Sequence, residues 1–246
     1  MTGEIASFPW RAQTRGIPRR EPRMDKTTMA ALEALLADDR HMAGKPFLNG
    51  YEQWLENGTA LFDPELLAVQ SGIPTDPVVA GIAMFRLREV FIDRFGFAVA
   101  TPDLIAALVS LGPVLEIGAG KGALSRLLAN AGANVIATDL QPQGDEHSWI
   151  DVQKSEATAA IRQTAGRNVI CSWPSLNGTW ITRAARAMEP GRILIVIGEG
   201  RGGCTGSDCF FDLQGKILEP CSEVLGGADV WRFPAIHDTA SAWRRL

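Results

Sequence analysis

One short stretch of this chain, VLEIGAGKGAL over residues 114–124, constrains its fold more than any other. An apolar run containing one carboxylate comes first, glycines follow at positions 118, 120 and 122, and leucines at helical spacing begin at Leu124. This order predicts a strand, a tight turn and a helix. Glycine lets the backbone adopt positive φ and approach a ligand closely, and the first amides of the helix point at whatever lies over the turn. The stretch therefore predicts a nucleotide-type cofactor site.

The chain after residue 113 alternates between strand-like and helix-like segments. Such alternation, with strands apolar enough to be buried on both faces, predicts a Rossmann-like, doubly wound, mostly parallel sheet flanked by helices. The last fifty residues lose this rhythm, so we expect antiparallel strands at the C-terminal edge. The predicted strands are residues 114–117, 134–138, 149–152, 168–171, 193–197, 216–218 and 229–233, and the predicted helices are residues 123–131, 156–164 and 179–188.

The region before residue 113 is predicted to be helical. Asp63-Pro64, Asp76-Pro77 and Thr101-Pro102 each place a capping side chain before a proline, which suits the first position of a helix. A further helix is expected after Asp25 and another around residues 51–56. The expected organisation is a disordered basic leader over residues 1–24, an N-terminal helical cap over residues 25–112, and a cofactor-binding core over residues 113–246.

Composition limits the partners that this chain would have. The net charge is −4, and the leader carries five Arg against two Glu, so the remaining residues carry −4 − 3 = −7. These residues, 25–246, form an acidic body, which disfavours nucleic acid as the main partner because phosphate contacts normally need a basic face. The arginine-rich leader is the one feature that would suit RNA or an acidic partner.

Targeting signals and metal motifs are not evident in the sequence. The chain shows no export signal at its start and no run of about 18 apolar residues, so we expect a cytoplasmic protein without membrane contact. The four cysteines are too few and too scattered for a disulfide framework in a chain this long. Free thiols and no bound metal are expected, with a zinc site at Cys204 and Cys209 as the alternative.

The glycine turn fits two kinds of cofactor. As G-x-G-x-x-A, residues 118–123 match the dinucleotide fingerprint, with Asp139 about twenty residues later as the ribose acid. As E-x-G-x-G-x-G, residues 116–122 resemble the first motif of the class I S-adenosylmethionine-dependent methyltransferases. Glu116, the third glycine, and the position of the motif after a helical segment favour the second interpretation.

The resemblance implies roles for residues beyond the turn. In that family the acid after the second strand binds the ribose hydroxyls, here Asp139, and the next residue, Leu140, can lie against the adenine. An acid near the third strand often accepts a hydrogen bond from the adenine amino group, and Asp151 is the candidate, although it could instead cap the next helix. The residues expected to bind S-adenosyl-L-methionine are Glu116, Gly118, Ala119, Gly120, Gly122, Asp139, Leu140 and Asp151.

The chemistry is expected at the carboxyl ends of the strands. The fourth strand delivers Ser172 and Trp173 to that edge, where a hydroxyl or carbonyl oxygen and a flat apolar side chain could align a methyl acceptor. The sequence Ser-Trp-Pro-Ser lies where amino-methyltransferases have their fourth motif but departs from it, so methylation of adenine or glutamine is not predicted. His237 is the candidate general base, and a surface histidine is the alternative.

The sequence thus predicts a methyltransferase that uses S-adenosyl-L-methionine. We expect a small-molecule acceptor, because the body is acidic and the helical cap could wall off a pocket; protein and RNA are the other acceptors considered. Two alternatives also fit the sequence, namely an NAD(P)-dependent oxidoreductase and a protein that retains the fold without catalysis.

Overall fold

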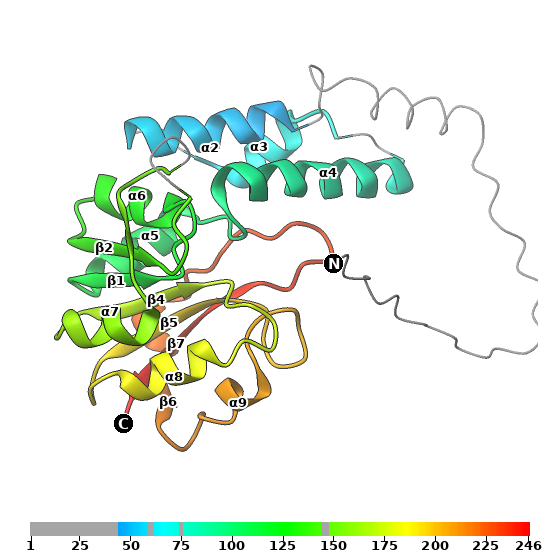
Figure 1. The fold of residues 1–246 in the computed structure, drawn as a ribbon. Coiled ribbons are helices and arrows are strands. Elements are labelled where there is room, and N and C mark those ends of the chain that lie inside the picture. Colours follow the sequence, from blue (N-terminus) through cyan, green and yellow to red (C-terminus); the bar gives the residue numbers. More distant parts are fainter. Residues whose placement is uncertain (1–43, 59–61, 74–75, 144–147) are drawn as a thin grey trace, which may run out of the picture.

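The structure is a computed structural model that describes residues 44–58, 62–73, 76–143 and 148–246. The predicted leader and the helix expected after Asp25 lie outside these residues. A seven-stranded sheet forms the middle layer, and helices cover both of its faces (Figure 1). The strands are β1 Val114–Ile117, β2 Val135–Asp139, β3 Val152–Lys154, β4 Asn168–Ser172, β5 Ile193–Gly198, β6 Leu218–Pro220 and β7 Thr239–Arg245.

The strand order is β3-β2-β1-β4-β5-β7-β6. The five strands from β3 to β5 in this order run parallel, and β7 is antiparallel to both β5 and β6. Order and direction confirm the predicted Rossmann-like, mostly parallel sheet with an antiparallel C-terminal edge. The order reverses between β1 and β4, so a crevice lies beyond the carboxyl ends of these two strands, where open sheets of this kind bind ligands.

The two faces of the sheet pack against different helices. Alternate residues of a strand point to opposite faces, and Val169 and Cys171 accordingly pack in one hydrophobic cluster while Ile170 packs in the other. In Figure 1, α5 and α6 cover one face and α7 and α8 cover the other. The helices are α2 Lys45–Asn57, α3 Pro64–Gln70, α4 Pro77–Phe95, α5 Pro102–Ser110, α6 Ala123–Asn130, α7 Ala157–Gln163, α8 Trp180–Ala187 and α9 Asp208–Phe211, with a 3-10 turn at Ser222–Leu225.

Three of these helices begin at the predicted caps. The Asp63 side chain accepts from the Leu66 amide at 3.0 Å. The Asp76 side chain accepts from the amides of Val78 and Val79, which lie in the first turn of α4 and have no partner within the helix. Thr101 caps α5 in the same way. None of the helices among the described residues is long and apolar enough to cross a membrane.

Two predicted strands lie elsewhere in the chain. The third strand is Val152–Lys154 rather than residues 149–152, and the long antiparallel strand is Thr239–Arg245 rather than residues 229–233. The aromatic residues of the segment 229–233 have a different role, because Trp231 and Phe233 pack their rings against Phe47 of α2. The predicted strand at 216–218 is β6, Leu218–Pro220, which begins at the last of the predicted residues.

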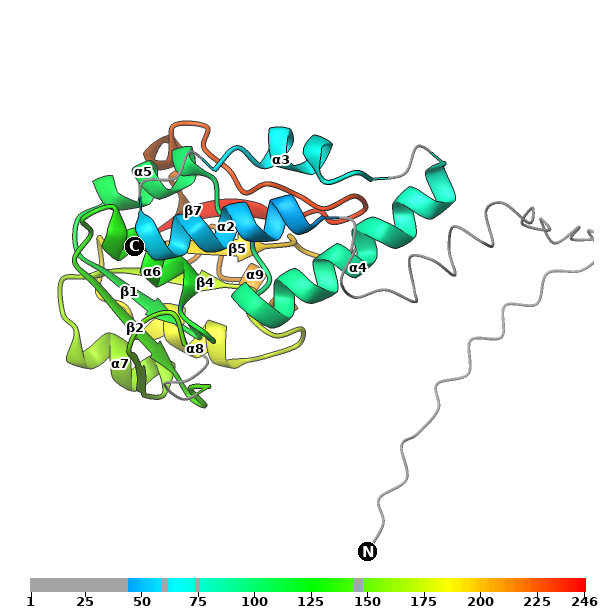
Figure 2. The same ribbon diagram turned by 90° about the horizontal axis from the view of Figure 1, so that it is seen from above.

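An aromatic cluster joins the N-terminal helices to the rest of the molecule. Phe91 of α4 is fully buried. The centroid of its ring lies 4.8 Å from the ring centroid of Tyr51 and 5.8 Å from that of Phe233. The same hydrophobic cluster includes residues of β1, β4, β5 and α6, so α2 and α4 share one core with the sheet. Seen from above in Figure 2, α2 lies over the sheet and α4 extends beyond it.

We predict that Phe91→Ala lowers the free energy of unfolding by about 3–5 kcal/mol, because it leaves a cavity where α2, α4 and the C-terminal segment meet. Phe85→Ala on the same helix is the matched control, since Phe85 is 62% exposed and the expected change stays within about 0.5 kcal/mol. Urea unfolding of both variants measures the difference. Equal effects at the two positions would show that α4 does not share the core.

Candidate cofactor site

The glycine turn and the end of β2 are held together by backbone and side-chain hydrogen bonds. The Ala119 amide donates to the Thr138 carbonyl at 3.0 Å, and the Gly120 amide donates to Asp139 Oδ2 at 2.9 Å. The other oxygen of Asp139, Oδ1, accepts from the Gln141 amide at 2.8 Å. Each carboxylate oxygen has two lone pairs, so Asp139 keeps acceptor capacity after both bonds are made.

Two of the three glycines have different tasks. A side chain at Gly120, which has φ 55°, would meet no atom within 4 Å, so the backbone there borders open space. A Cβ at Gly122 would lie 2.7 Å from Ile150 Cγ2, so that glycine is needed for packing and for the left-handed start of α6. Gly122 does not line the cavities described below.

Glu116 is the buried carboxylate of the site. It is 2% exposed, and Ser125 of α6 donates to its Oε2 at 2.5 Å. Burial raises the pKa of Glu116 to about 7; the bond from Ser125 acts in the opposite direction, and the negative charge of Asp139 adds to the increase. At neutral pH this side chain is therefore divided between its charged and neutral forms.

Two neighbouring cavities meet at the turn. The larger, of about 680 Å³, lies between Asp139 and α8, and the smaller, of about 300 Å³, lies between the turn and residues 95–98. Gly118, Asp139 and Trp173 line both cavities, so the two form one site along the carboxyl ends of β1, β2 and β4. The predicted Leu140 lines the larger cavity, and Glu116, Ala119, Gly120 and Ser172 line the smaller one.

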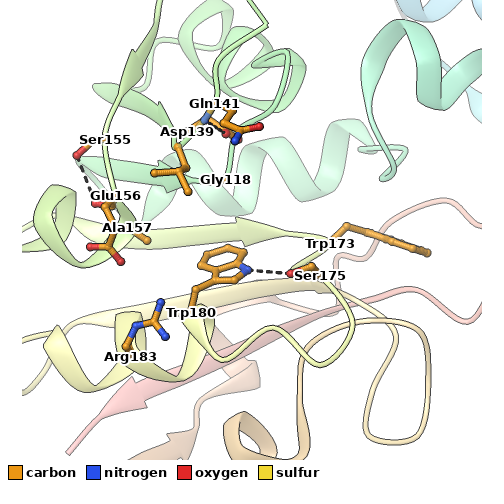
Figure 3. Close-up of a pocket in the computed structure, with 11 residues that line it drawn as sticks. Gly118, Asp139, Gln141, Ser155, Glu156, Ala157, Trp173, Ser175, Trp180 and Arg183 are labelled. Carbon is orange, nitrogen blue, oxygen red and sulfur yellow. Dashed lines mark hydrogen bonds between the residues drawn. The ribbon is translucent and has the colours of Figure 1, made fainter. Parts of the chain in front are cut away.

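One wall of the larger cavity was not predicted from the sequence. Figure 3 shows Trp180 and Arg183 of α8 on the opposite side of the cavity from Asp139. Trp180 comes within 3.2 Å of the position that a Cβ on Gly118 would occupy, and its indole nitrogen donates to Ser175 Oγ at 3.0 Å. The only available signal was an aromatic residue at the start of the helix after β4.

Asp151 does not line either cavity. It is exposed and precedes β3, whereas Ser155 and Glu156, which follow β3, line the larger cavity. The third strand begins three residues later and ends two residues later than predicted, and this accounts for the difference, because residues at the carboxyl end of a parallel strand face the crevice and residues at its start do not. Glu156 also caps α7 by accepting from the Ala159 amide at 3.0 Å.

The three candidate catalytic residues lie in different surroundings. Ser172 lines the smaller cavity, at the end of β4. The side chain of Trp173 is directed away from the larger cavity in Figure 3, and its indole nitrogen donates to Asp238. His237 is exposed, its amide donates to Glu199 Oε1 at 3.2 Å, and it lines neither cavity. Among the described residues no three His, Cys, Asp or Glu side chains come together as metal ligands would.

Comparison with known proteins finds similar folds at low identity. No protein-family model and no curated protein matches the sequence. A structure described as "Conversion of a Disulfide Bond into a Thioacetal Group during Echinomycin Biosynthesis" is 16% identical, with a TM-score of 0.44, over 66% of this chain and 92% of that chain. The S-adenosylmethionine-dependent methyltransferase SibL in its apo form is 12% identical, with a TM-score of 0.42, over 89% of this chain and 75% of that chain.

A third similar structure comes from Burkholderia thailandensis. It is 1,6-didemethyltoxoflavin-N1-methyltransferase with bound 1,6-didemethyltoxoflavin and S-adenosylhomocysteine, 15% identical with a TM-score of 0.39, over 67% of this chain and 84% of that chain. At this level of similarity none of these structures assigns a reaction to this chain.

The chain's own geometry defines its fold. The glycine turn follows β1, it is bonded to the acid that ends β2, and an antiparallel β7 pairs with β5. With the strand order, these features give the chain the class I S-adenosylmethionine-dependent methyltransferase fold that its sequence resembles.

We predict that Glu116 makes stability fall as pH rises. Its pKa is about 7 in the folded protein, against an ordinary value of 4.5 that we take for the unfolded chain. Between these values the folded state holds a proton that the unfolded state has released, so the free energy of unfolding decreases by up to about 3 kcal/mol from pH 4.5 to pH 7.

Glu116→Gln keeps a hydrogen-bonding side chain without the titrating proton and should remove this part of the slope. Urea unfolding at several pH values between 4.5 and 8 measures the difference between wild type and variant. An unchanged slope in Glu116→Gln would mean that the carboxyl does not titrate as described.

Proposed function

We propose that this protein is an S-adenosyl-L-methionine-dependent methyltransferase that acts on a small molecule. The observation that supports this most directly is the pairing of Asp139 with the open glycine turn in the smaller cavity. A carboxylate with free lone pairs beside exposed backbone is suited to a ribose diol and the groups attached to it. The proposal follows from this donor and acceptor set together with the fold.

The residues present fit such a cofactor. Asp139 would accept from the ribose hydroxyls, and Leu140, which is 59% exposed, would lie against the adenine with Trp180 on the opposite wall. Gly118 and Gly120 would let the backbone approach the amino-acid part, which residues 95–98 cover from the other side. When bound, the cofactor would supply an electrophilic methyl carbon on a sulfonium sulfur.

The chain itself would align the acceptor and exclude water. Methyl transfer is an in-line displacement, so holding the acceptor atom in line with the methyl carbon supplies much of the rate. Ser172 and Trp173 line the smaller cavity at the end of β4, where they could position such an atom. A small molecule is favoured because Phe95, Phe97 and Ile92 wall the smaller cavity with apolar side chains, and because the body is acidic.

We predict that the purified protein binds S-adenosylhomocysteine and that Asp139→Asn weakens this binding at least about tenfold, because the amide replaces one acceptor oxygen by an NH2 group that cannot accept from a ribose hydroxyl. Titration calorimetry measures the affinity. Asp151→Asn is the matched control, since this acid lies outside both cavities and should leave the affinity unchanged. If NADH bound in place of S-adenosylhomocysteine, the dinucleotide alternative would replace the proposal.

A second prediction concerns the space beside the turn. Gly120→Val would place a branched side chain in the open space that the cofactor needs, so binding of S-adenosylhomocysteine should be abolished. Gly72→Val is the control, because Gly72 has a similar φ of 64° and also meets no atom within 4 Å, so both variants carry the same kind of backbone strain. Loss of binding in both variants alike would point to instability rather than to occupation of the site.

A further inference from the structure

The turn after β4 is built around an unusual residue, Trp173. Its φ of 52° lies in the left-handed region, which a bulky side chain rarely adopts and which persists only where the surroundings hold it. Its amide donates to the Ile197 carbonyl at 2.8 Å, which fixes the backbone against the end of β5. Trp173 lines both cavities, so the conformation of the turn shapes the candidate site.

Three side chains hold the indole of Trp173. The Phe97 ring stacks on it with centroids 4.6 Å apart and planes 11° apart, and the Arg88 guanidinium lies 5.2 Å from the ring centroid. Nε and Nη2 of Arg88 are buried without a hydrogen-bond acceptor among the described residues. The guanidinium therefore interacts with the face of the Trp173 ring. The indole nitrogen donates to Asp238 Oδ1 at 2.9 Å.

Asp238 comes from a different part of the chain, directly before β7. It is 3% exposed, and among the described residues Trp173 is the only group that donates a hydrogen bond to its side chain. A buried carboxylate is costly unless it is bonded, and burial indeed raises the pKa of Asp238 while the bond from Trp173 opposes that increase. The nearby Glu199 is bonded differently, to the amides of Cys204 and His237.

We propose that Asp238 is a positioning residue for the candidate cofactor site, which it serves by holding Trp173 and thereby the strained turn between the two cavities. This inference rests on the proposed function. Asp238 acts through the indole of Trp173 and is not placed among the groups that would touch the cofactor.

The test is a double-mutant cycle on the affinity for S-adenosylhomocysteine, measured by titration calorimetry. Trp173→Phe removes the donor but keeps an aromatic ring, and Asp238→Ala removes the acceptor. Each single variant should bind about tenfold more weakly, and the double variant should also lose about tenfold rather than about a hundredfold, because both changes break the same bond. Asp238→Asn should retain most of the wild-type affinity, since its side-chain oxygen can still accept from the indole.

Asp229→Ala is the control for general loosening of the same segment. Asp229 accepts from the Ala240 amide at 2.7 Å and pairs with Arg232, and it does not contact the turn. Urea unfolding of every variant separates loss of stability from loss of binding. If Asp238→Ala does not fold, Trp173→Phe should still bind about tenfold more weakly while Asp238→Asn keeps most of the wild-type affinity, and an equal loss in these two variants would overturn the positioning role.

The outcomes are distinct for the two proposals. Wild-type protein that fails to bind S-adenosylhomocysteine contradicts the proposed function. If the wild type binds, three results would each overturn the positioning role and leave the proposed function standing. These are additive losses in the double variant, no rescue by Asp238→Asn, and an equal loss in Asp229→Ala.

Discussion

The hydrogen bond from the Gly120 amide to Asp139 links the two turns on which the whole site depends. The first turn follows β1 and the second follows β2, and the bond between them, 2.9 Å long, fixes one oxygen of the carboxylate toward the glycines. The Gln141 amide fixes the other oxygen. A carboxylate held in this way is already oriented toward the cavity, so less conformational freedom would be lost when a ligand binds.

The surroundings of this bond explain why the N-terminal helices belong to the site. Lys121, within the turn, donates to the Asp93 carbonyl near the end of α4, and Trp149 donates to the Arg94 carbonyl at 3.0 Å. Residues 95–98 then line the smaller cavity. The aromatic cluster around Phe91 packs α2 and α4 against the sheet, and Ile92 and Phe95 at the end of α4 line the smaller cavity.

Much of the fold and part of the site could be predicted from the sequence, for local physical reasons. Proline after Asp76 marks a helix start, and three glycines beside Glu116 mark a turn, because these signals depend only on neighbouring residues. The predicted start of β3 is three residues too early, which places Asp151 near the carboxyl end of that strand, whereas in the structure Ser155 follows the strand and lines the larger cavity. The contact between Trp173 and Asp238 joins residues 65 positions apart, and no local pattern predicts such a pair.

The central claim is that Asp139 and the open glycine turn hold the sugar and amino-acid portions of the cofactor. A crystal structure of the protein grown with S-adenosylhomocysteine tests this most directly. The account predicts both ribose hydroxyls within hydrogen-bond distance of the Asp139 carboxylate and the amino-acid portion against Gly118 and Gly120. A ligand bound elsewhere, or a ribose that makes no contact with Asp139, would contradict it.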